Sequence, residues 1–323
     1  MTQVEIHVLP SATAVYDLRA AQLRRRLAAK PKFCLVADRS LSTQLLFAQL
    51  AEHQRDCHAL RFRLASTLLH SPSRSFEGPS HPALSSQFVQ HCILDPLGKE
   101  HAPRDWVILP ELLASCEEVE AALAEQGGAW EQQPSQDDQE PSGAIQIQPQ
   151  ATGVLSRLRR SIESHEQLLQ RDPPDLLSLD LLASTAPGFA LCSSASLRRE
   201  CSTHLARLSP WLREQLAREF GDDPEQVPPF GLSIGPALFE RSAEVWLQGC
   251  GSELAEAVAM AFSEPDAEDL TALAPIAHSL NSGRVSLALD EAAAEELLES
   301  EGRSQLMRRY ANAGHHLVLN ELD

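Results

Sequence analysis

The sequence predicts an α/β protein with three layers, in which helices cover both faces of a mostly parallel, Rossmann-like sheet. The first observation is a set of short apolar runs without polar alternation, which is typical of strands that are buried on both faces. The second is that stretches with the apolar spacing of helices separate these runs, as in βαβ units. We therefore expect four buried strands of one sheet, at residues 33–36, 176–179, 245–247 and 285–289.

Periodicity predicts the remaining elements. Val4, Ile6 and Val8 alternate with polar residues, which predicts an opening strand, and the helical spacing that follows it ends before Pro31. By the same criteria we expect further strands at residues 61–64, 106–109 and 316–319, and helices at 14–29, from Gln44 onward, and at 86–93, 117–125, 154–170 and 295–310.

The chain has 323 residues, a length that suits one large α/β domain or two smaller ones. We predict a single domain over residues 1–323. Residues 131–153 interrupt the pattern, because Gln, Pro, Ser and Asp dominate there. Such a segment buries too little apolar surface to offset its chain entropy. We therefore predict a flexible insertion at residues 131–153.

Composition narrows the functional classes. The formal net charge of −18 weighs against a nucleic-acid binder, because phosphate contacts need clustered Lys and Arg. No apolar run approaches the length of a membrane span. The seven cysteines include no Cys-x-x-Cys pair, and His81, His91 and His101 do not have the spacing of metal ligands. We expect a cytoplasmic protein that needs no metal or other cofactor and has neither nucleic acid nor a membrane as its partner.

The loop at residues 38–43 is the first candidate for a binding site. It follows an expected strand and leads into an expected helix. Backbone N–H groups without helical partners point outward at a helix N-terminus, so this arrangement favours an anion. The hydroxyls of Ser40, Ser42 and Thr43 are within reach of such an anion. The alternative is that Ser42 or Thr43 only caps the helix.

Residues 227–294 carry a recognisable pattern. Val227 and Pro228 precede an apolar segment, Gly249 and Gly251 follow the run 245–247, and residues 290–293 read Asp-Glu-Ala-Ala. This arrangement resembles the C-terminal half of the glucosamine-6-phosphate deaminase / 6-phosphogluconolactonase family. The resemblance implies a Rossmann-like fold and a sugar phosphate held at the loop 38–43, with the three hydroxyls named above as its contacts.

The chain departs from the family pattern at other positions. Ala65 and Ser66 stand where the deaminases carry an Asp-Glu pair whose Asp is the general base. Neither side chain can take a proton from a sugar carbon near neutral pH. Residues 183–188 replace the family's Asp-Gly-His loop, and Leu254 replaces its phosphate-contacting Lys. The resemblance thus covers the scaffold better than the chemistry.

Two further residues have open roles. Arg213 lies near the family position of an Arg that contacts the phosphate, and Arg suits bidentate phosphate binding. The alternative is an exposed Arg on an amphipathic helix. Asp180 is the ionisable residue near the end of the run 176–179, and we expect it to end the strand rather than to catalyse.

We therefore predict a divergent protein of carbohydrate metabolism related to these deaminases and lactonases. It binds a phosphorylated sugar or an acidic metabolite through Ser40, Ser42, Thr43 and Arg213, with the ancestral catalysis lost or altered. One alternative is an active sugar-phosphate isomerase or lactone hydrolase with rebuilt catalytic residues. Another is a structural or regulatory partner subunit, and a homo-oligomer is compatible with each of these functions.

Overall fold

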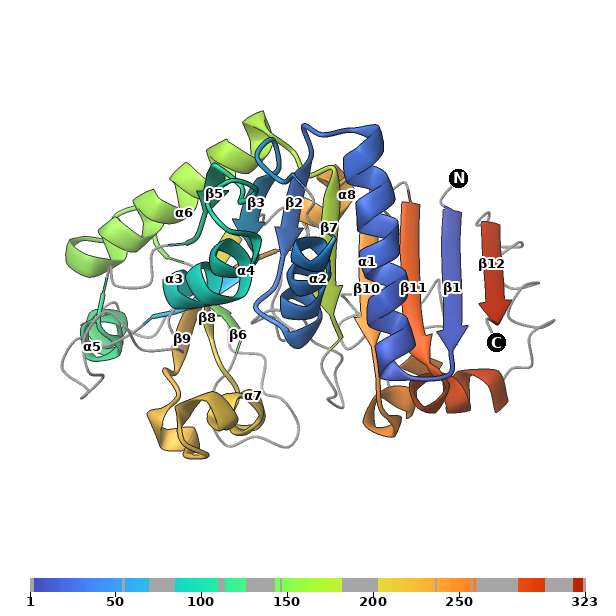
Figure 1. The fold of residues 1–323 in the computed structure, drawn as a ribbon. Coiled ribbons are helices and arrows are strands. Elements are labelled where there is room, and N and C mark those ends of the chain that lie inside the picture. The colour runs from blue at the N-terminus through green and yellow to red at the C-terminus, as the bar shows by residue number, and fades with distance from the viewer. Residues whose placement is uncertain are drawn as a thin grey trace.

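The computed structural model describes residues 3–53, 56–69, 85–109, 114–125, 143–145, 147–181, 203–235, 237–256, 258–259, 284–299 and 316–321. Within this part of the chain, eight strands form one sheet in which all neighbouring strands run parallel (Figure 1). In spatial order they are β12 (His316–Glu321), β1 (Gln3–Leu9), β11 (Arg284–Asp290), β10 (Val245–Gly249), β7 (Leu176–Asp180), β2 (Cys34–Ala37), β3 (Arg61–Leu64) and β5 (Asp105–Val107).

The four strands predicted from their apolar runs are consecutive neighbours in this sheet, in the order β11, β10, β7, β2. The register pairs Val245 with Val285 on one side and with Leu177 on the other. All residues of β2 and β10 are buried, as expected for strands that are covered on both faces. The predictions of a mostly parallel sheet and of these four strands are confirmed.

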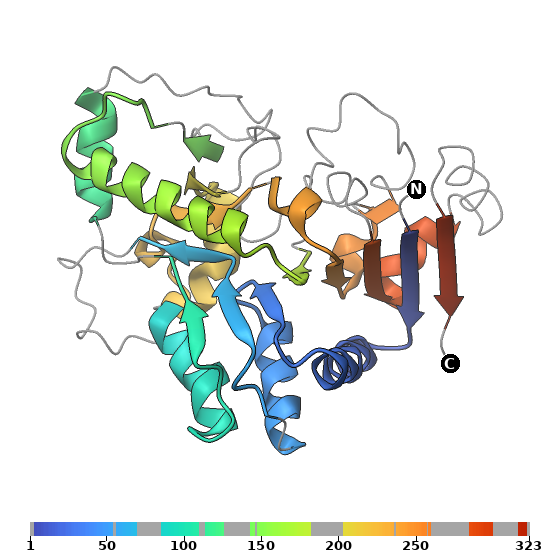
Figure 2. The same ribbon diagram turned by 90° about the horizontal axis from the view of Figure 1, so that it is seen from above.

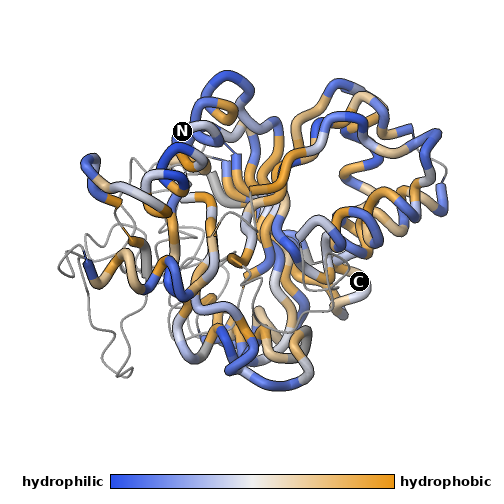
Figure 3. Tube along the Cα trace, turned by 90° about the vertical axis from the view of Figure 1, so that its left-hand side faces the viewer, coloured by the Kyte–Doolittle hydropathy of each residue, from blue (hydrophilic) through white to orange (hydrophobic). Residues whose placement is uncertain are grey.

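Helices cover both faces of the sheet and give three layers (Figure 2). On one face lie α1 (Ala12–Ala29), α2 (Leu41–Glu52), α3 (Ser85–Phe88), the π-helix η2 (Val89–Leu94) and α4 (Asp95–Leu97). On the other face lie α6 (Gly153–Arg171) and α8 (Ala237–Arg241). Apolar residues concentrate along the strands, and polar residues lie on the outer faces of the helices (Figure 3).

The fold contains a second, antiparallel sheet that the sequence did not predict. Its strands, in spatial order, are β4 (Ser66–Leu68), β9 (Phe230–Ile234), β8 (Thr203–Arg207) and β6 (Gly143–Ile145). Its core is shared with α5 (Cys116–Glu125) and α6, where Leu205, Phe230 and Leu232 are completely buried. β4 follows β3 after a single residue, Ala65, so the second sheet begins at the carboxyl edge of the first.

Part of the predicted insertion 131–153 lies outside the described residues. Of the rest, residues 143–145 form β6 and pair with β8, and Gly153 begins α6. The insertion therefore stays a prediction for residues 131–142. Among the described residues, no helix combines the length and the apolar character that crossing a bilayer requires.

Candidate functional site

The carboxyl ends of β2 and β7 meet at a point where the chain changes direction within the sheet. From β2 the chain continues to its neighbour β3, whereas from β7 it later reaches the neighbour on the opposite side, β10. Connections that leave adjacent parallel strands in opposite directions open a crevice, where α/β proteins usually bind ligands. Asp38 follows β2 directly and Asp180 is the last residue of β7. Both carboxylates therefore stand at this switch point.

The loop after β2 turns into α2 at Ser40. Ser40 has an extended backbone with φ −133°, and its Oγ accepts a hydrogen bond of 3.3 Å from the backbone N–H of Thr43. Ser40 is thus the N-cap, and the helix begins at Leu41. The expected start of α2 near Gln44 was wrong, and the alternative that Ser42 or Thr43 caps the helix does not hold. Ser42 and Thr43 instead lie buried in the first helical turn.

Asp38 is the centre of one half of the site. Its Oδ1 accepts hydrogen bonds from Ser40 Oγ at 2.8 Å and from Thr43 Oγ1 at 3.4 Å. Its Oδ2 accepts the backbone N–H of Asp180 at 2.8 Å. Asp38 is only 5% exposed. The structure thus brings Ser40 and Thr43 together, but around a carboxylate of the chain itself.

Asp180 is the centre of the other half. Its Oδ1 accepts hydrogen bonds from Ser42 Oγ and, at 2.7 Å, from Gln248 Nε2. Ser42 Oγ also lies 3.0 Å from Ser40 Oγ, so a continuous chain of polar atoms links the two carboxylates. Gln248 Nε2 makes a further contact of 3.3 Å with Ser178 Oγ, whereas no described residue donates a hydrogen bond to its buried carbonyl oxygen Oε1. An acceptor in that state can receive a donor from a ligand.

Burial raises the pKa of both carboxyl groups. For Asp38 the repulsion by Asp180 adds to the effect of burial, and the pKa lies well above its ordinary range. For Asp180 burial is the main cause of the raised pKa, and hydrogen bonds from Ser42 and Gln248 oppose it. Two interacting carboxyl groups of this kind titrate as a pair. The pair can hold and release a proton, and its oxygens can accept hydrogen bonds from hydroxyl groups.

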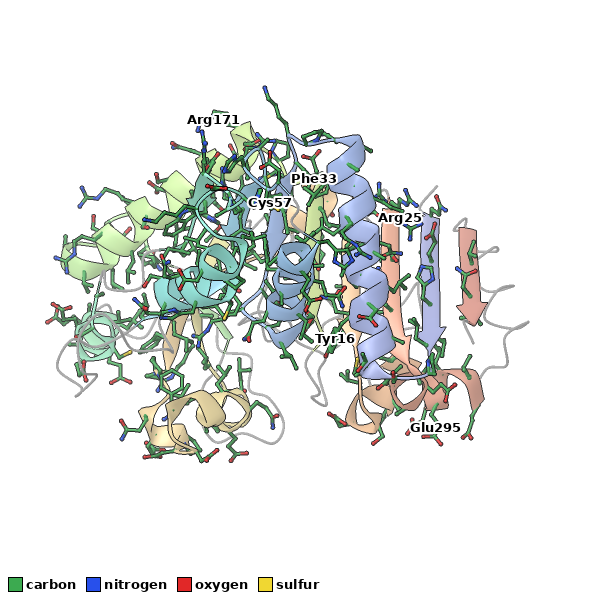
Figure 4. All side chains as sticks on the ribbon, viewed as in Figure 1. Tyr16, Arg25, Phe33, Cys57, Arg171 and Glu295 are labelled. Atoms are coloured by element: carbon green, nitrogen blue, oxygen red, sulfur yellow. The ribbon has the colours of Figure 1, made fainter. Side chains whose placement is uncertain are left out.

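Tyr16 and Cys250 border the pair. Tyr16 lies on α1 toward the carboxyl ends of the strands (Figure 4). Burial and a nearby Asp290 raise the pKa of the Cys250 thiol to about 12, so it remains protonated at neutral pH and is no nucleophile. Asp290 accepts the backbone N–H groups of Gly251 and Ala293, at 3.0 and 2.9 Å. Gly251 has φ +99°, a conformation that favours glycine.

The contacts that the structure describes for Arg213 are with residues outside this cluster. It belongs to α7 (Pro210–Leu216), donates a hydrogen bond of 2.9 Å to the carbonyl of Pro224, and lies 3.5 Å from the carboxylate of Glu225. Its side chain is only 13% exposed, which does not fit the alternative of an exposed Arg on a helix face. The structure brings Ser40, Ser42 and Thr43 together but holds Arg213 against the turn at η5 (Pro224–Gln226).

At the described positions that depart from the family pattern, the residue either is buried in the core or pairs with another strand of the second sheet. Ala65 is completely buried, and its backbone hydrogen-bonds to Ala37 and Ile234. Ser66 is paired with Ser233 in the second sheet. Leu254 is 3% exposed and packs in the main core, so no ligand contact replaces the family's Lys there. Residues 183–188 lie outside the described residues.

Two site residues were missed by sequence reasoning. Asp38 stood in the loop without a role of its own, and Gln248 was not singled out. The signal for Gln248 was a polar residue in an otherwise apolar run ending at Gly249. Asp180 was expected only to end its strand. Among the residues that the structure describes, no three His, Cys, Asp or Glu side chains are grouped as metal ligands would be.

Comparisons with known proteins agree with this architecture. No protein-family model matches the chain. A glucosamine-6-phosphate deaminase of Streptococcus suis is 29% identical over 146 residues, which is 45% of this chain and 59% of that protein. One from Oenococcus oeni is 28% identical over 142 residues, covering 44% and 57%. The matches therefore span somewhat more than half the length of these relatives.

Solved structures show the fold over most of the chain. A monomeric glucosamine-6-phosphate deaminase covers 91% of this chain with a TM-score of 0.64 at 13% identity, and all of that chain is covered. The 6-phosphogluconolactonase of Trypanosoma brucei covers 92% with a TM-score of 0.59 at 12% identity, again over its full length. The fold thus defines an α/β protein with a Rossmann-like parallel sheet. Sequence and fold together confirm the resemblance to the glucosamine-6-phosphate deaminase / 6-phosphogluconolactonase family.

Proposed function

We propose that the protein binds a phosphorylated sugar or a related acidic metabolite at the switch point between β2 and β7, and that the deaminase and lactonase activities have been lost. The relatives and structural neighbours act on phosphorylated sugars according to their names, which supports this class of ligand. Because the sequence matches span only part of those proteins, activity and ligand are proposals for this chain.

The polar cluster at the switch point carries the proposal. The N-terminus of α2 with Ser40, Ser42 and Thr43 suits an oxyanion, and Gln248 Oε1 suits a hydroxyl donor of a sugar. The position of the family's base holds the buried Ala65, which cannot transfer a proton. These groups support a ligand site at the switch point, and the buried Ala65 supports the loss of the inherited base.

A second candidate is an enzyme with rebuilt chemistry, and the Asp38–Asp180 pair favours it. Carboxyl groups with raised pKa values at the edge of a parallel sheet are a common form of general acid and base. Neither occupies the place of the family's base, so the reaction would differ in geometry from that of the relatives.

Ligand-induced stabilisation tests binding. Glucosamine 6-phosphate and 6-phosphogluconate should raise the melting temperature, and glucosamine and gluconate should do so much less. At a hundredfold excess over Kd the gain is about 2.7 kcal/mol. No stabilisation by either phosphate ester at any pH from 5.5 to 8 would refute the proposal.

Matched variants test the site. Ser40→Ala removes the N-cap of α2, and Ser11→Ala removes the N-cap of α1, where Ser11 Oγ accepts the N–H of Ala14 at 3.3 Å. Each should cost about 1 kcal/mol of stability. Only Ser40→Ala should also weaken ligand binding. Arg213→Met tests whether Arg213 leaves Pro224 to contact the phosphate, in which case affinity falls as well.

Steady-state assays with both phosphate esters separate the two candidates. We expect no turnover at the rate of an ordinary enzyme, which is about 1–10³ s⁻¹. Turnover in that range that is abolished by Asp38→Asn or Asp180→Asn would favour the rebuilt enzyme over the binding protein.

A further inference from the structure

The anion position at the N-terminus of α2 is already occupied by a group of the protein. The carboxylate of Asp180 accepts the hydroxyl of Ser42, and the backbone N–H of Ser42 also stabilises its charge. These first-turn groups of a helix are those that bind phosphate in other proteins. Gln248 Nε2 donates at 2.7 Å to the same oxygen of Asp180 that accepts the Ser42 hydroxyl. A phosphate at this place would compete with Asp180 for its donors.

The charged groups around Asp180 do not compensate the negative charge that a bound phosphate or sulfate would add. Asp38 on the loop after β2 repels it, and Tyr16 on α1 and Cys250 after β10 are neutral neighbours with raised pKa values. Arg19 on α1 attracts it, but the guanidinium of Arg19 donates to Leu247 O, Ser286 O and Ser286 Oγ, at 2.8, 2.7 and 2.9 Å. No cation forms an ion pair with either carboxylate in the described part of the chain.

We propose that Asp180 is a built-in competitor for the oxyanion site of α2, and that a phosphate or sulfate ester binds there only when the Asp38–Asp180 pair takes up one proton. The proposal rests on the proposed function, since it concerns the same site. A protonated carboxyl group is neutral, and its O–H can donate to the ester oxygen that arrives. Asp180 thereby becomes a residue that determines which anions bind and at which pH.

The raised pKa values of both carboxyl groups agree with this proposal, because burial already disfavours the doubly charged pair. A phosphate ester carries about −1.5 to −2 charges near neutral pH and has a second pKa of about 6. Its own titration would obscure that of the protein. A sulfate ester keeps one charge over this range, so glucose 6-sulfate is the better probe.

Isothermal titration calorimetry with glucose 6-sulfate tests the proposal at several pH values between 5 and 8.5. Buffers of different ionisation enthalpy report the number of protons taken up per ligand. We expect about one proton above the apparent pKa of the pair, and about a tenfold loss of affinity for each further pH unit. Asp180→Asn should bind the ester at least tenfold more tightly at pH 8, with less proton uptake and a weaker dependence on pH than the wild type.

Asp175→Asn is the matched control. Asp175 precedes the other end of β7 and accepts the backbone N–H of Cys34 at 2.8 Å, so the variant makes the same charge change away from the switch point. It should keep the proton uptake and the pH dependence of the wild type. If Asp180→Asn and Asp175→Asn change affinity equally, only net charge matters and the proposal is wrong.

The remaining outcomes separate this proposal from the proposed function. Binding by the wild type without proton uptake overturns the built-in competitor and leaves the binding function standing. No binding by the wild type at any pH, together with tight binding by Asp180→Asn, shows that Asp180 blocks the site at every pH, and this outcome overturns both the binding function and the proton-dependent binding proposed here. No binding by either protein overturns both.

Discussion

The backbone N–H of Asp180 donates a hydrogen bond of 2.8 Å to Oδ2 of Asp38, which joins the last residue of β7 to the residue after β2. The two residues are 142 positions apart in sequence. The bond fixes the carboxyl ends of two neighbouring strands and places the buried carboxyl group of Asp38 beside the partly buried one of Asp180. Proton binding by this pair therefore affects both the stability of the fold and the proposed site.

Asp38→Asn should stabilise the protein at high pH. Because the pKa of Asp38 is raised, the folded protein binds its proton more tightly than the unfolded chain does. The free energy of unfolding is therefore greatest at low pH and falls as pH rises through the folded-state pKa. Each unit of pKa shift corresponds to about 1.4 kcal/mol. Urea unfolding at pH 8 and pH 4.5 should show a gain for Asp38→Asn at pH 8 that shrinks at pH 4.5.

Asp175→Asn again provides the contrast. Asp175 forms an ion pair with Lys30 and accepts the N–H of Cys34, so losing its charge should lower stability at pH 8. If Asp38→Asn also loses stability at pH 8, its hydrogen bonds outweigh the cost of burying its charge.

The strands of the parallel sheet could be predicted from the sequence because their apolar character does not depend on their partners. Residues 245–247 read Val-Trp-Leu and are buried in any parallel sheet that is covered on both faces. The second sheet could not be predicted in this way. β8 and β9 are short, contain Ser, Thr and His, and are stabilised by pairing with each other across an interval of sequence that carries no strand pattern.

The candidate site was predicted in part. The loop 38–43 was identified from the order strand, polar loop, helix, which is a local pattern. The role of Asp180 depends on β7 lying beside β2, and strand order is not encoded in the periodicity of either strand. Gln248 lies on β10, and the register of β10 with β7 pairs Gln248 with Asp180. The helix start was misplaced because three residues near it can act as caps.

Arg19→Ala should destabilise the fold strongly. Arg19 is 3% exposed, and its guanidinium lies 5.0 Å from the ring centre of Trp246 while it donates to carbonyls of β10 and β11. Removing it leaves a cavity and unsatisfied acceptors, which should cost about 3 kcal/mol or more. Arg19→Lys should recover only part of this loss, because an ammonium group lacks the planar fork of donors.

The exposed Arg25 on the same helix is the control for Arg19 (Figure 4). Arg25→Ala should change the free energy of unfolding by less than about 0.5 kcal/mol. Equal losses for Arg19→Ala and Arg25→Ala in guanidinium titrations would show that helix propensity, and not the buried guanidinium, sets the effect.

Gly249→Ala should overpack the core next to the site. A Cβ at Gly249 would lie 2.8 Å from Leu254 Cδ1 and 3.3 Å from Leu181 Cδ1. Overpacking of this kind costs about 1–3 kcal/mol. A double-mutant cycle with Leu254→Ala checks the cause, since the double variant should lose less than the sum of the two single changes. Additive losses would place the strain elsewhere.

His165→Asn should make the protein less sensitive to acid. His165 is 6% exposed, its Nδ1 lies 2.8 Å from Thr203 Oγ1, and burial, with repulsion from Arg63, lowers its pKa from 6.5 to about 4. Between these values the unfolded chain binds more protons than the folded protein. The free energy of unfolding therefore falls as pH is lowered through this window. For His165 the loss between pH 7 and pH 5 is about 2 kcal/mol.

An Asn side chain can keep the contact with Thr203 but does not titrate, so His165→Asn should lose less stability than the wild type between pH 7 and pH 5. Thr203→Val is the matched control, because it removes the hydroxyl at 2.8 Å and leaves the imidazole in place. It should lower stability at every pH and keep the acid sensitivity of the wild type.

His204, whose pKa burial also lowers to about 4, should account for part of the sensitivity that remains in His165→Asn. Urea unfolding curves of the three proteins at pH 7, 6 and 5 decide the matter. If the wild type and His165→Asn lose the same stability between pH 7 and pH 5, the pKa of His165 is not lowered by its burial and the prediction is wrong.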